Sequence, residues 1–154
     1  KTNVKGWHSQ TDMQTKPEYK PLVDQLFLAM KHVWDDQHLD KRPLLGNMWA
    51  NINPPGGSNQ PHVHPNCFYS GVYYIKSNLK SGRLKLYDPR PGVQLYLPRR
   101  TKTEIPKSLW REASLEPVPG RILIFPAWVW HGVEPNESND IRISVSFNFT
   151  QEGF

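Results

Sequence analysis

Three histidines have the residue type and the spacing of metal ligands. His62 and His64 stand two residues apart between two prolines, and His131 comes shortly after the apolar run 121–125. Residues i and i+2 of a strand point to the same face, so the first two imidazoles could reach one ion. A strand at 121–125 would bring His131 to the mouth of a barrel. Because neutral imidazoles suit Fe(II), Zn, Cu and Ni, we predict that His62, His64 and His131 bind a metal.

The other histidines and the single cysteine carry weaker signals. His8, His32 and His38 lie in the N-terminal segment and in a predicted helix, and we interpret all three as surface residues. Cys67 could be read as a further metal ligand, but a cysteine zinc site usually has a second cysteine. We therefore favour a small apolar residue entering a strand, and one cysteine excludes an intramolecular disulfide.

The segment 141–148 alternates between polar and apolar residues and predicts a strand. The polar face holds Arg142, Ser144, Ser146 and Asn148, and the apolar face holds Ile141, Ile143, Val145 and Phe147. If the polar face looks into a barrel, it lines a ligand cavity; otherwise it meets solvent. Inside a cavity Arg142 would need an anion, and its planar guanidinium matches a carboxylate. Ser144 could add a hydroxyl donor.

The elements that must position these residues are one helix and many short strands. Apolar residues at helical spacing predict a helix over about 18–38, packed on the outside of a sheet. The chain before it, to about Pro17, reads as polar and irregular. The predicted strands are 45–53, 62–64, 68–75, 83–87, 113–117, 121–126, 130–133 and 141–150, with one more at about 94–97. Short strands separated by turns favour an antiparallel sandwich or barrel.

Length and composition fit one β domain that carries a positive charge. The 154 residues predict a single domain over 1–154, with the barrel at about 45–150. The net charge of +5 favours anionic partners, although no nucleic-acid-binding motif is visible. No segment resembles a signal peptide or a membrane span, so we expect a soluble, cytoplasmic protein.

Taken together and in order, these motifs resemble the Fe(II)/2-oxoglutarate dioxygenases. The order is His62-Val63-His64, the tyrosine-containing strand 70–75, then His131, then Arg142-Ile143-Ser144. Within that superfamily the chain is most similar to the prolyl-hydroxylase-like branch and to a group of short 2-oxoglutarate-Fe(II) oxygenases. The resemblance covers about residues 45–150. It implies a double-stranded β-helix, or jelly roll, of the cupin-like kind, with the N-terminal helix packed on the sheet.

The resemblance also implies cofactors, a reaction and roles for single residues. Fe(II) and 2-oxoglutarate would hydroxylate a substrate that the sequence does not identify, with release of succinate and CO2. His62 and His131 match the two histidine ligands. Arg142, helped by Ser144 and Tyr74, would bind the far carboxylate of 2-oxoglutarate. Asn51 and Asn53 share a strand face and are candidates to contact the cosubstrate or the substrate.

His64 departs from the family pattern, which usually has Asp or Glu at that position. We favour a three-histidine site in which His64 replaces the carboxylate. Alternatively, a carboxylate from elsewhere completes the triad, with Asp88 the best candidate, or His64 turns away and leaves a position open. Imidazole in place of carboxylate makes the site one unit more positive, which should weaken its hold on Fe(II).

Two other functions remain open at this point. A cupin-type metalloenzyme with three histidines and no 2-oxoglutarate would explain His64 but leave Arg142 without a role. A non-catalytic metal-binding jelly roll would show no turnover. The substrate could be a protein, a metabolite or a nucleic acid. Trp128 and Trp130 could wall the pocket or simply pack, and the Pro- and Arg-rich stretch 88–112 could cover the substrate.

Overall fold

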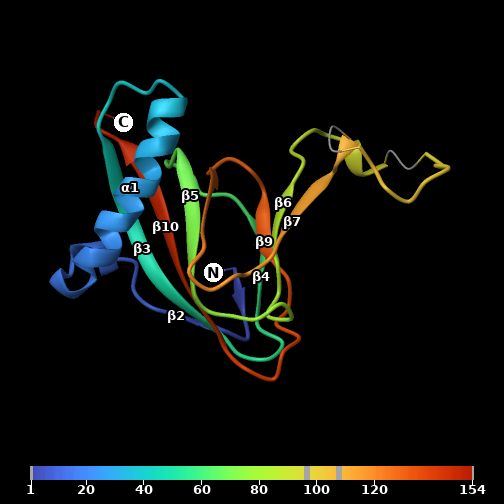
Figure 1. Cartoon of the computed structure of the whole chain (residues 1–154), viewed down its shortest axis with the longest axis horizontal. Coiled ribbons are helices and arrows are strands. Elements are labelled where there is room, and N and C mark those ends of the chain that lie inside the picture. Colours follow the sequence, from blue (N-terminus) through green and yellow to red (C-terminus); the bar gives the residue numbers. More distant parts are fainter. Residues whose placement is uncertain (1, 96–97, 107–108, 154) are drawn as a thin grey trace.

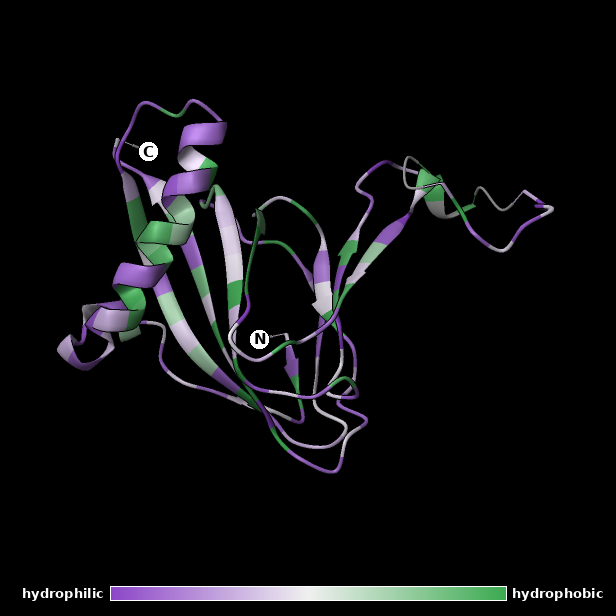
Figure 2. Ribbon diagram, viewed as in Figure 1, coloured by the Kyte–Doolittle hydropathy of each residue, from purple (hydrophilic) through white to green (hydrophobic). Residues whose placement is uncertain are grey.

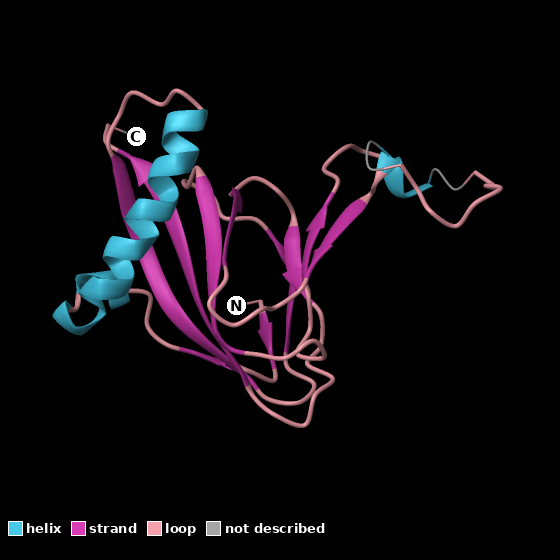
Figure 3. Ribbon diagram, viewed as in Figure 1, coloured by secondary structure: helices cyan, strands magenta, loops and turns pink. Residues whose placement is uncertain are grey.

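Two five-stranded antiparallel sheets and one long helix form the molecule (Figures 1 and 3). The computed structural model describes residues 2–95, 98–106 and 109–153. The first sheet has the order β2 (Trp7–His8), β3 (Pro43–Asn53), β10 (Arg142–Gln151), β5 (Tyr69–Lys76), β8 (Ile122–Pro126). The second has the order β1 (Asn3–Val4), β4 (Ser58–His62), β9 (His131–Val133), β6 (Leu84–Tyr87), β7 (Glu112–Leu115). The mainly β architecture predicted from the sequence is confirmed.

The first sheet is built around β10, which pairs with β3 on one side and β5 on the other. Its apolar residues Val145, Phe147 and Phe149 are buried in one core with residues of the helix. Because side chains alternate along a strand, Arg142 and Ser144 point the opposite way, toward the second sheet. The polar face of β10, whose direction the sequence left open, therefore looks into the space between the sheets.

Helix α1 (Lys20–Asp36) covers the outer face of the first sheet, as predicted, and follows a 3-10 turn at Pro17–Tyr19 (Figure 1). Leu26, Met30 and Trp34 recur every four residues and are buried. Figure 2 shows the resulting alternation of hydrophobic and hydrophilic residues along the helix. Burying each such side chain contributes about 1.5–3 kcal/mol to stability. This explains why the apolar face of the first sheet faces the helix, on the outside of the sandwich.

The N-terminal segment differs from the irregular chain that its sequence suggested. Residues 2–12, called the N-terminal strap below, include β1 at the edge of the second sheet and β2 at the edge of the first. Asn3 pairs with Asn59, and Trp7 pairs with Ile52. The strap therefore passes from one sheet to the other and ties their edges together. Its strands are only two residues long and give no periodic signal.

The stretch between β6 and β7 forms an arm that extends away from the two sheets in Figure 1. At its base the Asp88 N–H donates to the Arg111 carbonyl at 2.8 Å. A 3-10 turn (Val93–Leu95) stands where a strand was expected at about 94–97, and residues 96–97 lie outside the described residues. The described residues of this arm point away from the space between the sheets in that view. Within the described chain, no helix is long and apolar enough to cross a membrane.

Candidate metal and anion site

The three predicted histidines come together at one end of the space between the sheets. His62 ends β4 and lies opposite His131, which begins β9. His64 lies just beyond the strand rather than on it, where its N–H donates to the Ala127 carbonyl at 3.2 Å. The His62 ring centroid is 4.3 Å from that of His131 and 4.9 Å from that of His64. One nitrogen from each ring lies within 4.8 Å of the others, close enough to share an ion.

Backbone contacts orient two of these rings. The Nδ1 of His62 lies 2.7 Å from the Gln60 carbonyl, and that of His131 lies 2.8 Å from the Val129 carbonyl. Since a carbonyl only accepts, each Nδ1 carries the proton and each Nε2 keeps its lone pair. Burial lowers the pKa of His62 and lowers the pKa values of His64 and His131 to about 4. The three imidazoles are therefore neutral near pH 7.

No carboxylate stands beside this cluster in the described parts of the chain, where the three histidines are the only metal-competent group. Asp88 instead forms an ion pair with Arg90, whose side chain lowers the pKa of that carboxyl. Cys67 is half-buried, and burial raises the pKa of its thiol. The described structure thus brings His64, and not Asp88, beside the other two histidines.

A cavity of about 320 Å³ joins the histidines to Arg142. Arg142 is only 2% exposed, and its Nη1 donates to the carbonyls of Ser81 at 2.7 Å and Gly82 at 3.2 Å. Within the residues that the structure describes, no carboxylate pairs with this guanidinium. Burial consequently lowers the pKa of Arg142 to about 10. A buried cation without a counter-charge is costly, so the cavity is suited to an anion.

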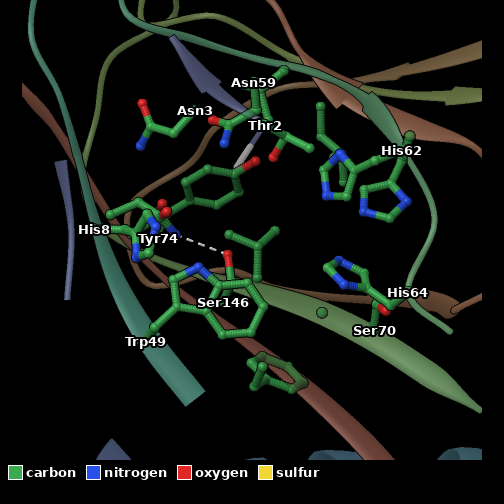
Figure 4. Close-up of a pocket in the computed structure, with 18 of the residues that line it drawn as sticks. Thr2, Asn3, His8, Trp49, Asn59, His62, His64, Ser70, Tyr74 and Ser146 are labelled. Carbon is green, nitrogen blue, oxygen red and sulfur yellow. Dashed lines mark hydrogen bonds between the residues drawn. The ribbon is translucent and has the colours of Figure 1, made fainter. Parts of the chain in front are cut away.

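Tyr74 and Ser144 complete this polar end of the cavity. They are cross-strand partners, both buried, and both line the cavity with Arg142. Burial raises the pKa of Tyr74 to about 12, so its hydroxyl stays protonated and can donate to an anion. Asn51 also lines the cavity and donates from Nδ2 to the Ser146 Oγ at 2.9 Å, the dashed line in Figure 4. Asn53 is fully buried but is not among the lining residues.

Several lining residues had not been singled out in the sequence. The interpretation of His8 as a surface residue is wrong, because pairing with Asn51 brings it to the cavity wall. Trp128 and Trp130 are 62% and 49% exposed, and neither is among the residues that line the cavity. The unpredicted lining residues include Thr2, Asn3, His8, Thr11, Trp49 and Asn59. Most belong to the strap, whose long-range pairing leaves no local pattern.

Gly82 positions Arg142 and supplies a test of that role. Its φ is +88°, and a Cβ there would overlap the Glu134 carbonyl and lie 3.0 Å from the Arg142 Nη1. We expect Gly82→Ala to lower the free energy of unfolding by at least about 2 kcal/mol more than the backbone strain alone. Gly120→Ala is the matched control, with φ +82° and nothing within 4 Å. Equal losses in denaturant unfolding would show that Gly82 does not act through these contacts.

The comparisons with known proteins agree with this architecture. The family model "Putative 2OG-Fe(II) oxygenase" matches residues 47–148. A Pseudomonas putida prolyl-4-hydroxylase superposes with a TM-score of 0.59 at 19% identity, covering 96% of this chain and 72% of that one. A 2OG-Fe(II) oxygenase-family protein from Burkholderia pseudomallei superposes with a TM-score of 0.58 at 11% identity, covering 78% of this chain. The chain spans 50% of the length of that second protein. None of the curated proteins compared with the sequence matches it.

The two antiparallel sheets form a jelly roll, as the sequence predicted, and one cavity between them is lined by the three-histidine cluster and the buried Arg142. The chain belongs to the 2OG-Fe(II) oxygenase family, whose model spans most of both sheets. The predicted resemblance to this family, with prolyl-hydroxylase-type structural neighbours, is confirmed. Members of the family use Fe(II) and 2-oxoglutarate.

Proposed function

We propose that this protein is an Fe(II)- and 2-oxoglutarate-dependent hydroxylase. The observation that carries the proposal is Arg142, a buried guanidinium with no described carboxylate partner, in the same cavity as three neutral imidazoles. The imidazoles offer ligand atoms for a divalent metal, and Arg142 offers a counter-charge for a dicarboxylate. The donor set and the unpaired cation therefore both fit the groups that the family uses.

Each residue would have a distinct role at the occupied site. His62, His64 and His131 would hold the iron through nitrogen atoms. Arg142, Ser144 and Tyr74 would bind the far carboxylate and so orient the 2-oxo acid along the cavity. When bound, iron and 2-oxoglutarate would supply dioxygen activation, with release of succinate and CO2. The protein's contribution is geometry and the exclusion of water, to which the apolar lining residues Val72, Leu84 and Phe125 contribute.

A three-histidine donor set changes the charge of the site. A carboxylate at position 64 would offset one of the two positive charges of Fe(II), whereas imidazole offsets none. We therefore propose weaker iron binding than a two-histidine, one-carboxylate site would give, and less discrimination against other divalent metals. We therefore expect the affinity of this site to rise clearly in the order Fe(II) < Co(II) < Ni(II) < Cu(II).

A second candidate is a three-histidine metalloenzyme of the cupin type that uses no 2-oxoglutarate. The absence of a carboxylate beside the described histidines favours it. It gives the buried Arg142 no anion to bind, unless the substrate itself carries a carboxylate. The same cavity supports both candidates, so the cosubstrate has to be tested directly.

The deciding assay supplies Fe(II) and 2-oxoglutarate to protein purified without oxygen and then admits air. Succinate formation above that of a Zn(II)-loaded sample is expected even without the main substrate, because uncoupled turnover is common in such enzymes. The Zn(II) sample controls for spontaneous decarboxylation. If no succinate forms and 2-oxoglutarate also leaves the metal spectrum unchanged, the proposed function is wrong and the second candidate gains.

A further inference from the structure

His64 is the least constrained of the three clustered histidines. It lies beyond the end of β4, in the loop that leads to β5, where its N–H donates to the Ala127 carbonyl at 3.2 Å. His62 and His131 each have an Nδ1 beside a backbone carbonyl, whereas no carbonyl of the described residues holds the His64 ring in this way. The orientation of this third imidazole therefore depends on the side chains packed around it.

The side chain packed beside His64 from outside the cluster is the indole of Trp49. The two ring centroids are 5.9 Å apart and the ring planes meet at 60°, within the roughly 4.5–7 Å separation of favourable aromatic pairs. Both side chains are half-buried and both line the cavity, as Figure 4 shows. The other ring contacts described for His64 are with its fellow cluster members His62 and His131, at 4.9 and 5.0 Å.

Trp49 itself has a fixed place on the first sheet. It pairs with Ser146 of β10, and both side chains face the cavity. The preceding residue, Met48, points the opposite way and is fully buried in the core beneath α1. The Met48 N–H also donates to the Thr11 carbonyl at 3.2 Å. The indole is thus carried by a strand anchored on both of its faces, whereas His64 is carried by a loop.

The contact between the two rings matters because a metal ligand must present its nitrogen in one direction. An imidazole that turns freely on a loop occupies the binding orientation only part of the time, and its apparent affinity for the metal falls by that fraction. Packing against a fixed indole restricts this rotation. Residues that orient a metal ligand are accordingly important for metal affinity, even though they do not touch the ion.

We propose that Trp49 is a positioning residue of the metal centre, whose indole holds the His64 imidazole in the orientation that lets it share an ion with His62 and His131. It gives His64 the support that backbone carbonyls give the other two rings. The inference rests on one part of the proposed function, the metal on three histidines. It does not depend on 2-oxoglutarate or on the substrate.

The test is a double-mutant cycle of Trp49→Ala and His64→Ala on the full chain, with Fe(II) affinity measured by anaerobic competition with a chelator. Trp49→Ala should weaken Fe(II) binding about three- to ten-fold while His64 is present, as expected for a lost aromatic contact. In the His64→Ala background it should have no further effect. Trp49→Phe keeps an aromatic ring and should retain most of the affinity.

Two further variants complete the cycle. Trp7→Ala is the matched control, because Trp7 is an exposed tryptophan of the neighbouring strand β2 and does not line the cavity; it should leave Fe(II) affinity unchanged. Trp49→Leu fills more of the indole's space than alanine does but brings no ring. It provides the same cycle should the alanine variant fail to fold.

The absorption spectrum of the Co(II)-loaded protein gives a second readout, since its visible bands depend on the number and geometry of the ligands. Trp49→Ala should shift these bands toward those of His64→Ala. Equal losses of Fe(II) affinity in both backgrounds would mean that Trp49 acts on the fold in general and would overturn the inference, as would an unchanged affinity. A wild type that binds neither Fe(II) nor Co(II) overturns the metal centre and this inference together, whereas a failure of 2-oxoglutarate to bind affects only the proposed function.

Discussion

Replacing Arg142 with alanine is expected to weaken 2-oxoglutarate binding by at least a hundred-fold. Removing one partner of a buried charge pair costs about 3–5 kcal/mol, and Arg142 is the only arginine or lysine among the described residues that line the cavity. Arg142→Lys should recover only part of the loss, because an ammonium lacks the planar fork that matches a carboxylate. Calorimetric titration of the Fe(II)-loaded protein with 2-oxoglutarate measures both effects.

The same variants distinguish a binding role from a structural one. Iron affinity should be unchanged in Arg142→Ala, since Arg142 is not part of the histidine cluster. Arg42→Ala is a suitable control, because Arg42 is an exposed arginine and is not among the residues that line the cavity. An Arg142→Ala protein that folds, binds iron and keeps its 2-oxoglutarate affinity would remove Arg142 from the cosubstrate site.

Single substitutions of the three histidines are expected to have unequal effects on iron. His62→Ala and His131→Ala should each weaken Fe(II) binding by a hundred-fold or more, because their rings are fixed by backbone carbonyls for coordination. Among the described residues no carbonyl holds the His64 ring in this way, so His64→Ala should cost less iron affinity. His64→Asp restores a carboxylate and should bind Fe(II) at least as tightly as the wild type.

Competition with a chelator of known affinity gives these iron constants. His32→Ala is the control, because His32 is an exposed histidine of α1 and no part of the cluster. If His64→Ala holds iron as tightly as the wild type, His64 is not a ligand and the site has an open position. If His131→Ala does so, the three-histidine centre itself is wrong.

How far the site could be predicted is clearest on β10. Alternation along 141–148 fixes which residues share a face, but it does not say which face looks inward. That choice is made by α1, whose buried Leu26 and Met30 pack on the apolar face and turn Arg142 into the cavity. The helix was predictable from its own periodicity, but its docking depends on contacts between distant parts of the chain.

The strap and the turn before β9 show the limits of prediction more sharply. Asn3 and His8 reach the cavity through two-residue pairings with β4 and β3, and so short a strand leaves no periodic pattern. Asn53 shared the predicted face with Asn51, yet only Asn51 lines the cavity. Trp128 and Trp130 flank His131 in sequence, but the turn into β9 leaves them exposed. Spacing and the family resemblance thus singled out the histidines and Arg142, whereas the wall around them depends on tertiary structure.

The most direct test of the central claim is a crystal structure of the full chain grown without oxygen in Fe(II) and 2-oxoglutarate. We predict one iron bound by nitrogen atoms of His62, His64 and His131, and the 2-oxo acid extending from it to Arg142. An iron ligated by a carboxylate such as Asp88 would contradict the three-histidine centre. A 2-oxo acid absent from the cavity at saturating concentration, with iron in place, would contradict the proposed cosubstrate.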